Sequence, residues 1–200
     1  EFRRVLFRSY FMKKEFRKKV IESRKNKSAN FVLSNSNLIT EKLLQMEDIR
    51  NATNIMLYLN FNNEVQTDNL IKKLLSLNKI VSSPITIKEN HTLIPTQITD
   101  LKEGLRIGAY GIREPNEKSP TIDIKALDVV IVPAVAYDIH CYRLGYGGGF
   151  YDRFLENLRK DAITIGIAFD FQIFDSIPKE THDAQLDYIV TETRIITPNN

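Results

Sequence analysis

The sequence is poor in the residues that form disulfides and zinc sites. Its 200 residues include one cysteine, Cys141, and three histidines scattered along the chain. A single cysteine excludes an intramolecular disulfide and favours a reducing compartment, so we expect a cytoplasmic protein. The cysteine and the histidines lack the spacing of zinc ligands. No apolar run approaches the roughly 20 residues needed to cross a bilayer, so we expect no membrane partner.

Positive charge is only in small excess, and most of that excess lies in the N-terminal segment. The composition is 42% hydrophobic and 26% charged, with a net charge of +3, which is ordinary for a globular domain. A basic N-terminal helix could contact nucleic acid or membrane, or its charges could form a solvated face. No aromatic stacking pattern accompanies these basic residues, so we expect no nucleic-acid partner.

The first eleven residues differ in character from those that follow. They contain arginines but no uninterrupted apolar segment and no small-residue cleavage site, so they do not match a secretory signal. Met12 and the Lys-Lys-Glu-Phe-Arg after it resemble a natural start. We therefore expect residues 1–11 to be a non-native extension and residues 12–200 to form one domain.

Hydrophobic periodicity predicts alternating helices and strands. Helical spacing of apolar residues, with Thr67 as a plausible N-cap, indicates helices over residues 13–25, 31–46, 67–77 and 152–158. Short apolar runs, one of them ended by Pro84, indicate strands over residues 55–59, 79–84, 91–95, 97–98, 127–133, 162–168 and 187–191. A strand–helix–strand order favours a parallel sheet. The sequence therefore predicts a single three-layer α/β domain with a mostly parallel sheet and an N-terminal helix.

Half of the eight glycines lie in one short segment. Residues 143–152 read Arg-Leu-Gly-Tyr-Gly-Gly-Gly-Phe-Tyr-Asp and fall between a predicted buried strand and a predicted helix. Glycine allows positive φ and close approach of backbone N–H groups, and a helix N-terminus favours an anion. The segment therefore predicts a phosphate-binding loop, although glycines also serve tight turns. It lacks the G-x-x-x-x-G-K-[ST] and G-x-G-x-x-G patterns, which disfavours the common nucleotide-binding loops.

The glycine segment and its flanks together resemble the 5-formyltetrahydrofolate cyclo-ligase family. Beyond residues 143–153, the resemblance includes Lys-Lys-Glu-Phe-Arg at 13–17 and Leu-Asn-Phe-Asn-Asn-Glu at 59–64. It continues with Val-Pro-Ala-Val-Ala-Tyr-Asp at 132–138 and His-Asp-Ala-Gln-Leu-Asp at 182–187. The resemblance implies a compact α/β fold similar to the NagB/RpiA/CoA-transferase group, and we expect a monomer.

The resemblance also implies an ATP-dependent ring closure. 5-Formyltetrahydrofolate and ATP would become 5,10-methenyltetrahydrofolate, ADP and phosphate, with Mg²⁺ as the metal. The formyl oxygen would attack the γ-phosphate, and N10 of the folate would then close on the activated carbon as phosphate leaves. Phosphoryl transfer needs charge neutralisation and in-line positioning more than a protein nucleophile, and a loop of amides with nearby cations meets that need.

One set of residues is implied at ATP and the metal. The i, i+4 spacing of Lys13 and Arg17 puts them on one helix face, which could equally be an exposed basic face. Asp152 and Asp183 would hold Mg²⁺, although alone they could be a helix N-cap and a loop residue. The ATP-binding residues, with Arg143 and Tyr151 in catalytic roles, would be Lys13, Lys14, Arg17, Arg143, Leu144, Gly145, Tyr146, Gly147, Gly148, Gly149, Phe150 and Tyr151.

A second set is implied at the folate. The Glu64 carboxylate could accept two parallel N–H donors of a pterin ring, although a lone glutamate is more often solvated. Tyr110 could instead be a core or turn residue. The family usually has Tyr-Tyr-Asp where this chain has Phe150-Tyr151-Asp152, and the lost hydroxyl is worth on the order of 1 kcal/mol. The folate-binding residues would be Leu59, Glu64, Tyr110, Tyr146, Gly147, Gly148, Gly149 and Phe150.

Three other functions compete with this one. A Cys141–His140 nucleophile is disfavoured, because adjacent side chains diverge and a third orienting group is required. A module that binds nucleotide or folate without turnover is favoured only by Phe150. An enzyme of the same fold group acting on a sugar phosphate or an acyl-CoA would need a catalytic carboxylate motif that is not found, and the His182-Asp183 match speaks against it.

Overall fold

A large, mostly parallel sheet forms the centre of the molecule, as predicted. The computed structural model describes residues 2–180 and 183–198, with side chains from residue 12 onward except that of residue 109. In this part of the chain seven strands pair in the order β12-β11-β9-β6-β1-β2-β3. The inner strands run parallel, and β12 and β3 pair antiparallel at the edges. The strands are β1 (Asn54–Leu57), β2 (Ile80–Ile87), β3 (Thr92–Gln97), β6 (Val129–Val132), β9 (Ile163–Ile167), β11 (Tyr188–Val190) and β12 (Ile195–Ile196).

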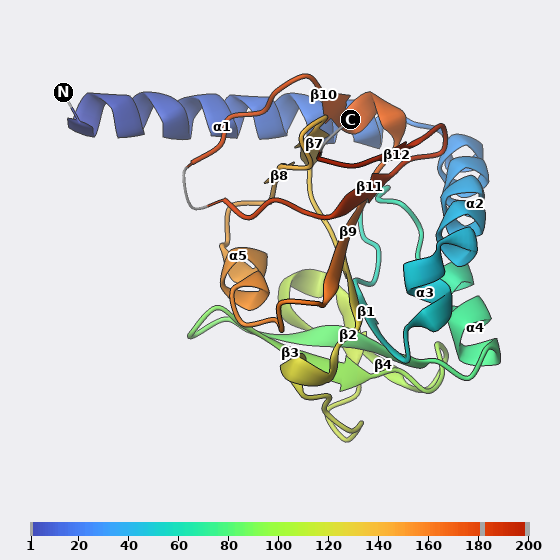
Figure 1. The fold of residues 1–200 in the computed structure, drawn as a ribbon. Coiled ribbons are helices and arrows are strands. Elements are labelled where there is room, and N and C mark those ends of the chain that lie inside the picture. Colours follow the sequence, from blue (N-terminus) through green and yellow to red (C-terminus); the bar gives the residue numbers. More distant parts are fainter. Residues whose placement is uncertain (1, 181–182, 199–200) are drawn as a thin grey trace.

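Both faces of this sheet are covered (Figure 1), which confirms the three-layer prediction. Ile55 and Leu57 of β1 pack on one face and Met56 on the other, so this central strand is buried on both faces. The first face meets the helices α2 (Ala29–Gln45), α3 (Glu47–Asn51) and α4 (Asp68–Ser76). The opposite face meets α5 (Phe150–Leu155) and a small sheet of β7 (Ala136–Asp138), β8 (Arg143–Leu144) and β10 (Ile173–Phe174).

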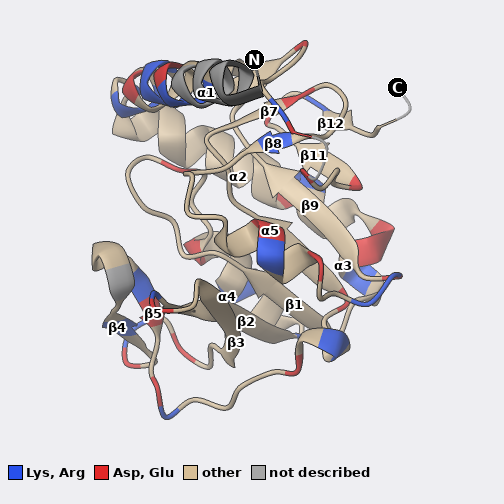
Figure 2. Cartoon of the chain, turned by 90° about the vertical axis from the view of Figure 1, so that its left-hand side faces the viewer, with Lys and Arg blue, Asp and Glu red and all other residues tan. Residues whose placement is uncertain are grey.

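The N-terminal helix α1 (Phe2–Lys25) lies across one end of the molecule (Figure 1). Val20 is buried against Ala136 and Leu144, and the ring of Phe16 meets that of Phe174 edge-on at 4.8 Å. Basic residues lie along the described part of α1 (Figure 2), and this packing brings one of them, Arg17, against the carbonyl of Gly145 in the glycine segment. Although α1 has 24 residues, no helix in the described residues is long and apolar enough to cross a membrane.

The region 85–125 is more regular than its sequence indicates. Strand β2 continues through Pro84, which pairs with Pro95 on β3, so the prediction that Pro84 ends the strand is wrong. Neither proline has a backbone N–H, so this pair donates no hydrogen bond to the ladder and the strand continues past it. The remaining elements are β4 (Leu105–Ile107), β5 (Arg113–Pro115) and the short 3₁₀ helices η1 (Ala109–Gly111), η2 (Ile124–Ala126) and η3 (Asp170–Gln172).

One predicted helix start is confirmed without its capping bond, and another differs from the prediction. Thr67 occupies the N-cap position of α4, but its hydroxyl donates to the carbonyl of Tyr58 at 2.9 Å instead of capping the helix. Helix α5 begins at Phe150, not Asp152, because Gly149 at φ 67° turns the chain into the helix and occupies the N-cap position. Asp152 therefore lies in the first turn, which removes the N-cap alternative for that residue.

Candidate functional site

A cavity of about 510 Å³ opens where the order of the sheet changes direction. From β1 the chain moves outward to β2, whereas from β6 it moves to β9 on the other side. Ligands of open α/β sheets bind outside the carboxyl ends of the strands at such a switch point. Tyr58 and Leu59, which follow β1, and Pro133, which follows β6, line the cavity, so it lies where this rule expects it.

The glycine segment forms one wall of this cavity. Gly145, Gly147, Gly148 and Gly149 all line it. Gly147 has φ 99°, a conformation that residues with a Cβ rarely adopt. A Cβ at Gly148 would lie only 2.7 Å from a ring carbon of Phe150, so a larger residue there would displace that ring. The predicted loop is therefore present, and its glycines are needed for its shape.

Among the described residues, two buried polar groups beside the loop have no hydrogen-bond partner. Arg143 donates from Nη2 to the Asp152 carboxylate, but its Nε has no partner in the described part of the chain. The Tyr151 hydroxyl is likewise buried without one, and burial raises the pKa of Tyr151 well above its ordinary value. Unsatisfied buried donors are costly, so these two groups are suited to binding a ligand that enters the cavity.

The structure separates the predicted N-terminal cations. Arg17 donates from Nε to the carbonyl of Gly145 at 2.7 Å and therefore lies against the loop. Lys13 pairs with Glu180 at 3.0 Å and Asp183 at 3.4 Å, outside the cavity lining. Lys14 is exposed and Leu144 is buried in the core beside α1, and neither lines the cavity. ATP contacts by all four of these residues remain predictions.

Glu64 lies on the opposite wall and is buried, not solvated. Its Oε2 accepts the backbone N–H of Phe61 at 2.9 Å, and its Oε1 accepts the hydroxyl of Tyr146. Arg24 Nη1 lies 3.8 Å from Oε1. Burial raises the pKa of Glu64, while the positive charge of Arg24 and the two hydrogen bonds act to lower it. The carboxylate is thus held in a fixed position at the edge of the cavity.

Tyr146 connects the glycine loop to Glu64. Its ring is half exposed to the cavity, and its hydroxyl lies between Arg24 Nη2, at 2.8 Å, and the Glu64 carboxylate. Burial of this hydroxyl, followed by the negative charge of Glu64, raises the pKa of Tyr146 well above its ordinary value. The hydroxyl therefore keeps its proton at neutral pH and donates a hydrogen bond to the carboxylate.

Arg24 is the residue that sequence reasoning missed. It is only 2% exposed, and besides Tyr146 and Glu64 it contacts the carbonyl of Asn62 through Nε at 3.1 Å. The available signal was its position seven residues after Arg17, which is two helical turns and the same face of α1. Arg24 lines the cavity and Arg17 lies against the glycine loop, so these two residues supply positive charge from α1.

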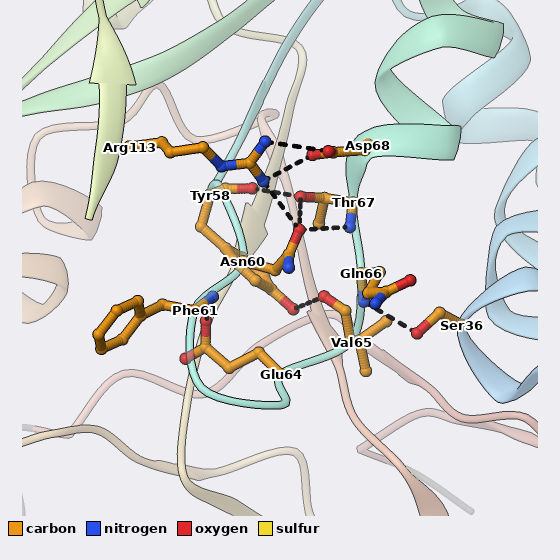
Figure 3. Close-up of polar contacts among 10 residues, drawn as sticks. All are labelled: Ser36, Tyr58, Asn60, Phe61, Glu64, Val65, Gln66, Thr67, Asp68 and Arg113. Carbon is orange, nitrogen blue, oxygen red and sulfur yellow. Dashed lines mark hydrogen bonds and ion pairs between the residues drawn. The ribbon is translucent and has the colours of Figure 1, made fainter. Parts of the chain in front are cut away.

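The loop that carries Glu64 is fastened by a second network (Figure 3). Arg113 binds Asp68 with two hydrogen bonds of 2.8 and 2.9 Å and reaches Asn60 at 3.3 Å. The Asn60 side chain accepts the backbone N–H of Thr67 at 3.3 Å. Because both ends of residues 60–67 are tied in this way, the position of the Glu64 loop is fixed by the fold.

The other predicted folate residues, Leu59, Tyr110 and Phe150, also line the cavity. Tyr110 is 58% exposed, has φ 60°, and packs edge-on against Phe150 at 6.3 Å, so it is not a core residue. Leu59 is buried in the main core and presents only part of its surface to the cavity. Phe150 packs its ring between Tyr110 and His91, so the aromatic contact at this position is retained without a hydroxyl.

The two predicted metal ligands lie in different surroundings. Asp152 lines the cavity and is paired with Arg143. Asp183 is paired with Lys13 and accepts the backbone N–H of Glu180 at 2.7 Å. No group of three or more His, Cys, Asp or Glu side chains within the described residues could hold a metal ion, and His182 lies outside them. Metal binding by these aspartates remains a prediction.

Cys141 is buried in the core and lines no part of the cavity. Its thiol contacts the carbonyl of Ile196 at 3.6 Å. Burial, with Asp138 and Asp187 adding to it, raises the pKa of the thiol to about 12. A reactive cysteine needs a lowered pKa, so this environment agrees with the expectation that Cys141 is not a nucleophile.

The fold and the site define an α/β protein whose ligand cavity, at the switch point of a parallel sheet, has a glycine loop and a buried carboxylate on facing walls. The model of the 5-formyltetrahydrofolate cyclo-ligase family matches residues 10–192. The chain therefore belongs to the 5-formyltetrahydrofolate cyclo-ligase family. The known reaction of this family is the ATP-dependent cyclisation of 5-formyltetrahydrofolate to 5,10-methenyltetrahydrofolate.

Similar proteins agree with this assignment. A 5-formyltetrahydrofolate cyclo-ligase of Haemophilus influenzae is 34% identical over 152 residues, covering 74% of this chain and 80% of that protein. A probable 5-formyltetrahydrofolate cyclo-ligase of Schizosaccharomyces pombe is 30% identical over 200 residues, covering 92% and 98%. The solved structure of Aquifex aeolicus 5,10-methenyltetrahydrofolate synthetase matches with a TM-score of 0.83 at 28% identity, covering 94% of each chain.

Proposed function

We propose that this chain performs the cyclo-ligase reaction in the cavity between residues 143–152 and Glu64. One observation carries the proposal: an anion-binding type of loop and a buried, oriented carboxylate face the same space of about 510 Å³. The reaction requires two substrates to meet at one point: ATP, which is a polyanion, and the folate, whose fused pterin ring carries N–H donors. The two walls provide complementary groups for these two partners.

Glu64 is proposed to bind the pterin ring of the folate. Adjacent N–H donors on that ring match the two oxygens of a carboxylate, and such charge-assisted pairs are stronger than neutral hydrogen bonds. Phe61, Tyr110 and Tyr146 are partly exposed aromatic residues that line the cavity and could pack against the flat rings of the substrate. Tyr146 would act twice, by packing against the ligand and by orienting Glu64.

Arg143 and Tyr151 are proposed to serve the phosphoryl transfer. The formyl oxygen attacks the γ-phosphate and ADP leaves; N10 then attacks the formyl carbon, and the C–O bond breaks as phosphate departs. The transferred phosphoryl group spreads negative charge over its oxygens. The Nε of Arg143 and the hydroxyl of Tyr151, which have no hydrogen-bond partner in the described residues, would donate to those oxygens. The amides of residues 145–149 would bind the rest of the triphosphate.

Mg²⁺ is proposed to bind at Asp152 and Asp183. Mg²⁺ is usually held by one or two carboxylates together with substrate phosphates and water, so a cluster of protein ligands is not required. Asp152 fits this mode, because its side chain is 39% exposed at the cavity and Arg143 contacts only its Oδ1. Asp183 fits less directly, since its Oδ2 already binds Lys13 and the Glu180 N–H. The ion would supply charge neutralisation at the phosphates.

We further propose a cytoplasmic monomer. The single buried cysteine suits a reducing compartment.

The test is an absorbance assay with purified protein, Mg²⁺, ATP and 5-formyltetrahydrofolate. We expect the near-ultraviolet absorbance of the methenyl product to grow, and ADP to appear only when the folate is present. Glu64→Gln should raise the KM for the folate far more than the KM for ATP, because it removes one charge from the folate wall alone. Ligand binding in a calorimeter without any product would instead indicate a binding module, and the proposal would be wrong.

A further inference from the structure

The turn between β2 and β3 touches the glycine loop through one side chain. His91 Nδ1 lies 2.9 Å from the carbonyl oxygen of Gly148, 57 positions later in the sequence. The His91 ring also packs against that of Phe150, with 5.0 Å between the centroids. A carbonyl oxygen only accepts, so the contact requires a proton on Nδ1. The tip of an edge hairpin thus donates a hydrogen bond to the backbone of the proposed phosphate loop.

The backbone of His91 is itself unusual. Its φ is 55°, in the left-handed region that non-glycine residues adopt only occasionally, with Asn, Asp and His enriched among them. Its N–H forms a long contact of 3.4 Å with the carbonyl of Lys88 inside the same turn. Local backbone bonding in the turn is thus weak, and the side-chain contact with the loop is the stronger attachment of this residue.

Within the described residues, His91, Arg17 and Arg153 each contact a carbonyl of the loop. Arg17 donates to the carbonyl of Gly145 at 2.7 Å, and Arg153 approaches that of Gly149 at 3.4 Å. The three donors come from α1, the β2–β3 turn and α5, so the loop is held from three directions.

Holding these carbonyls also orients the amides that follow them. In a trans peptide the C=O of one residue and the N–H of the next point in opposite directions, and the described residues contain no cis peptide. Fixing the Gly148 carbonyl on His91 therefore turns the Gly149 N–H away from the hairpin. Within the described part of the chain, no N–H of residues 146–149 donates to another residue. These amides are available to an anion.

We propose that His91 is a positioning residue of the phosphate loop: by holding the Gly148 carbonyl it presents the Gly149 N–H to a phosphate of ATP. The inference rests on the proposed binding of ATP at this loop. It adds to it a residue outside the loop that determines the loop's geometry. The sequence pattern did not indicate this role, because His91 lies in a turn far from the glycine segment.

Two substitutions separate the donor of His91 from its ring. His91→Phe keeps a ring against Phe150 and removes the donor. His91→Asn keeps an N–H at nearly the position of Nδ1, and asparagine tolerates the left-handed backbone. His140→Asn is the matched control, because His140 is exposed and is not among the residues that line the cavity.

We expect His91→Phe to raise the KM for ATP about threefold to tenfold, the effect of one hydrogen bond, with the KM for 5-formyltetrahydrofolate and the melting temperature near those of the unmodified protein. His91→Asn should restore most of the loss. Equal KM values for ATP in His91→Phe and the unmodified protein would overturn the inference, as would an equal defect in His91→Asn. Equilibrium dialysis with Mg²⁺ and ATP distinguishes failure of the proposed function from failure of the proposed role of His91. If the unmodified protein binds no ATP, the proposed function fails and this inference fails with it.

Discussion

The guanidinium of Arg24 donates a 2.8 Å hydrogen bond to the hydroxyl of Tyr146, and that hydroxyl donates in turn to the carboxylate of Glu64. Arg24 of the N-terminal helix thereby orients Tyr146 of the glycine loop. Its positive charge also offsets the negative charge of Glu64, which lies in the loop between β1 and α4. Burial would otherwise favour the protonated form of Glu64. The relay therefore preserves a charged acceptor in a place where charge is costly.

The first prediction concerns the acid limb of the pH profile. Burial raises the pKa of Glu64 and Arg24 lowers it, so Arg24→Gln should raise that pKa further. The ionised carboxylate is proposed to bind the pterin. The acid limb of the pH profile of kcat/KM for 5-formyltetrahydrofolate should therefore move to higher pH, by on the order of one pH unit. Arg50→Gln, at an exposed position of α3, is the control. An unchanged acid limb in Arg24→Gln would contradict this account.

The second prediction separates stability from activity at Tyr151. Its buried hydroxyl has no partner in the described residues, so Tyr151→Phe should leave the melting temperature equal or raise it by a few degrees. The same change should lower kcat about 10- to 100-fold if the hydroxyl donates to a charged phosphoryl group. Tyr137→Phe should instead lower the melting temperature and leave kcat near the original value, because the Tyr137 hydroxyl donates to the carbonyl of Val132 at 2.7 Å. Full activity in Tyr151→Phe would exclude a catalytic role.

The third prediction concerns the metal. Asp152→Asn removes the charge of a carboxylate at the cavity and should raise the Mg²⁺ concentration for half-maximal activity about tenfold or more. Asp183→Asn should shift the same titration if Asp183 shares the ion. Asp161→Asn, at an exposed side chain paired with Arg159, should leave the titration unchanged. A normal Mg²⁺ titration in Asp152→Asn would remove that residue from the metal site.

The fourth prediction concerns Cys141. A thiol pKa of about 12 leaves roughly one molecule in ten thousand as thiolate near pH 8, so a disulfide reagent should label the native protein very slowly. Unfolding in guanidinium should expose one fast-reacting thiol. Cys141→Ala should keep kcat close to the original value. Rapid stoichiometric labelling of the folded protein would show that the thiol is more accessible than its burial indicates.

The main sheet was predictable because its central strands are buried on both faces. Runs such as residues 129–132 are entirely apolar, which is typical of a strand inside a parallel sheet. The small sheets were not predictable, since β8 and β10 have two residues each and carry no periodicity. Pro84 was misread for a similar reason: its effect depends on Pro95 opposite, which the local sequence does not contain.

The site was predictable where its chemistry is local. The glycines of residues 145–149 lie within a few positions of one another, so the sequence alone predicts a flexible-backbone loop suited to an anion, and these glycines do line the cavity. Glu64 was placed only by the family resemblance, since burial of one carboxylate depends on Arg24 and Tyr146 at distant positions. His91 gave no local signal at all, because its meaning lies in a contact with Gly148 across the fold.

Helix α1 has a consequence for the order in which the protein can assemble. Its contacts span 122 positions from Arg24 to Tyr146 and 170 from Lys13 to Asp183. Contacts of such long separation form late in folding, because the closure of a long loop must be met before they can stabilise the chain. During synthesis α1 leaves the ribosome well before its partners do. A nascent chain can thus form the β1–β2 part of the sheet early, but α1 cannot complete its contacts around the cavity until residues 143–152 have emerged.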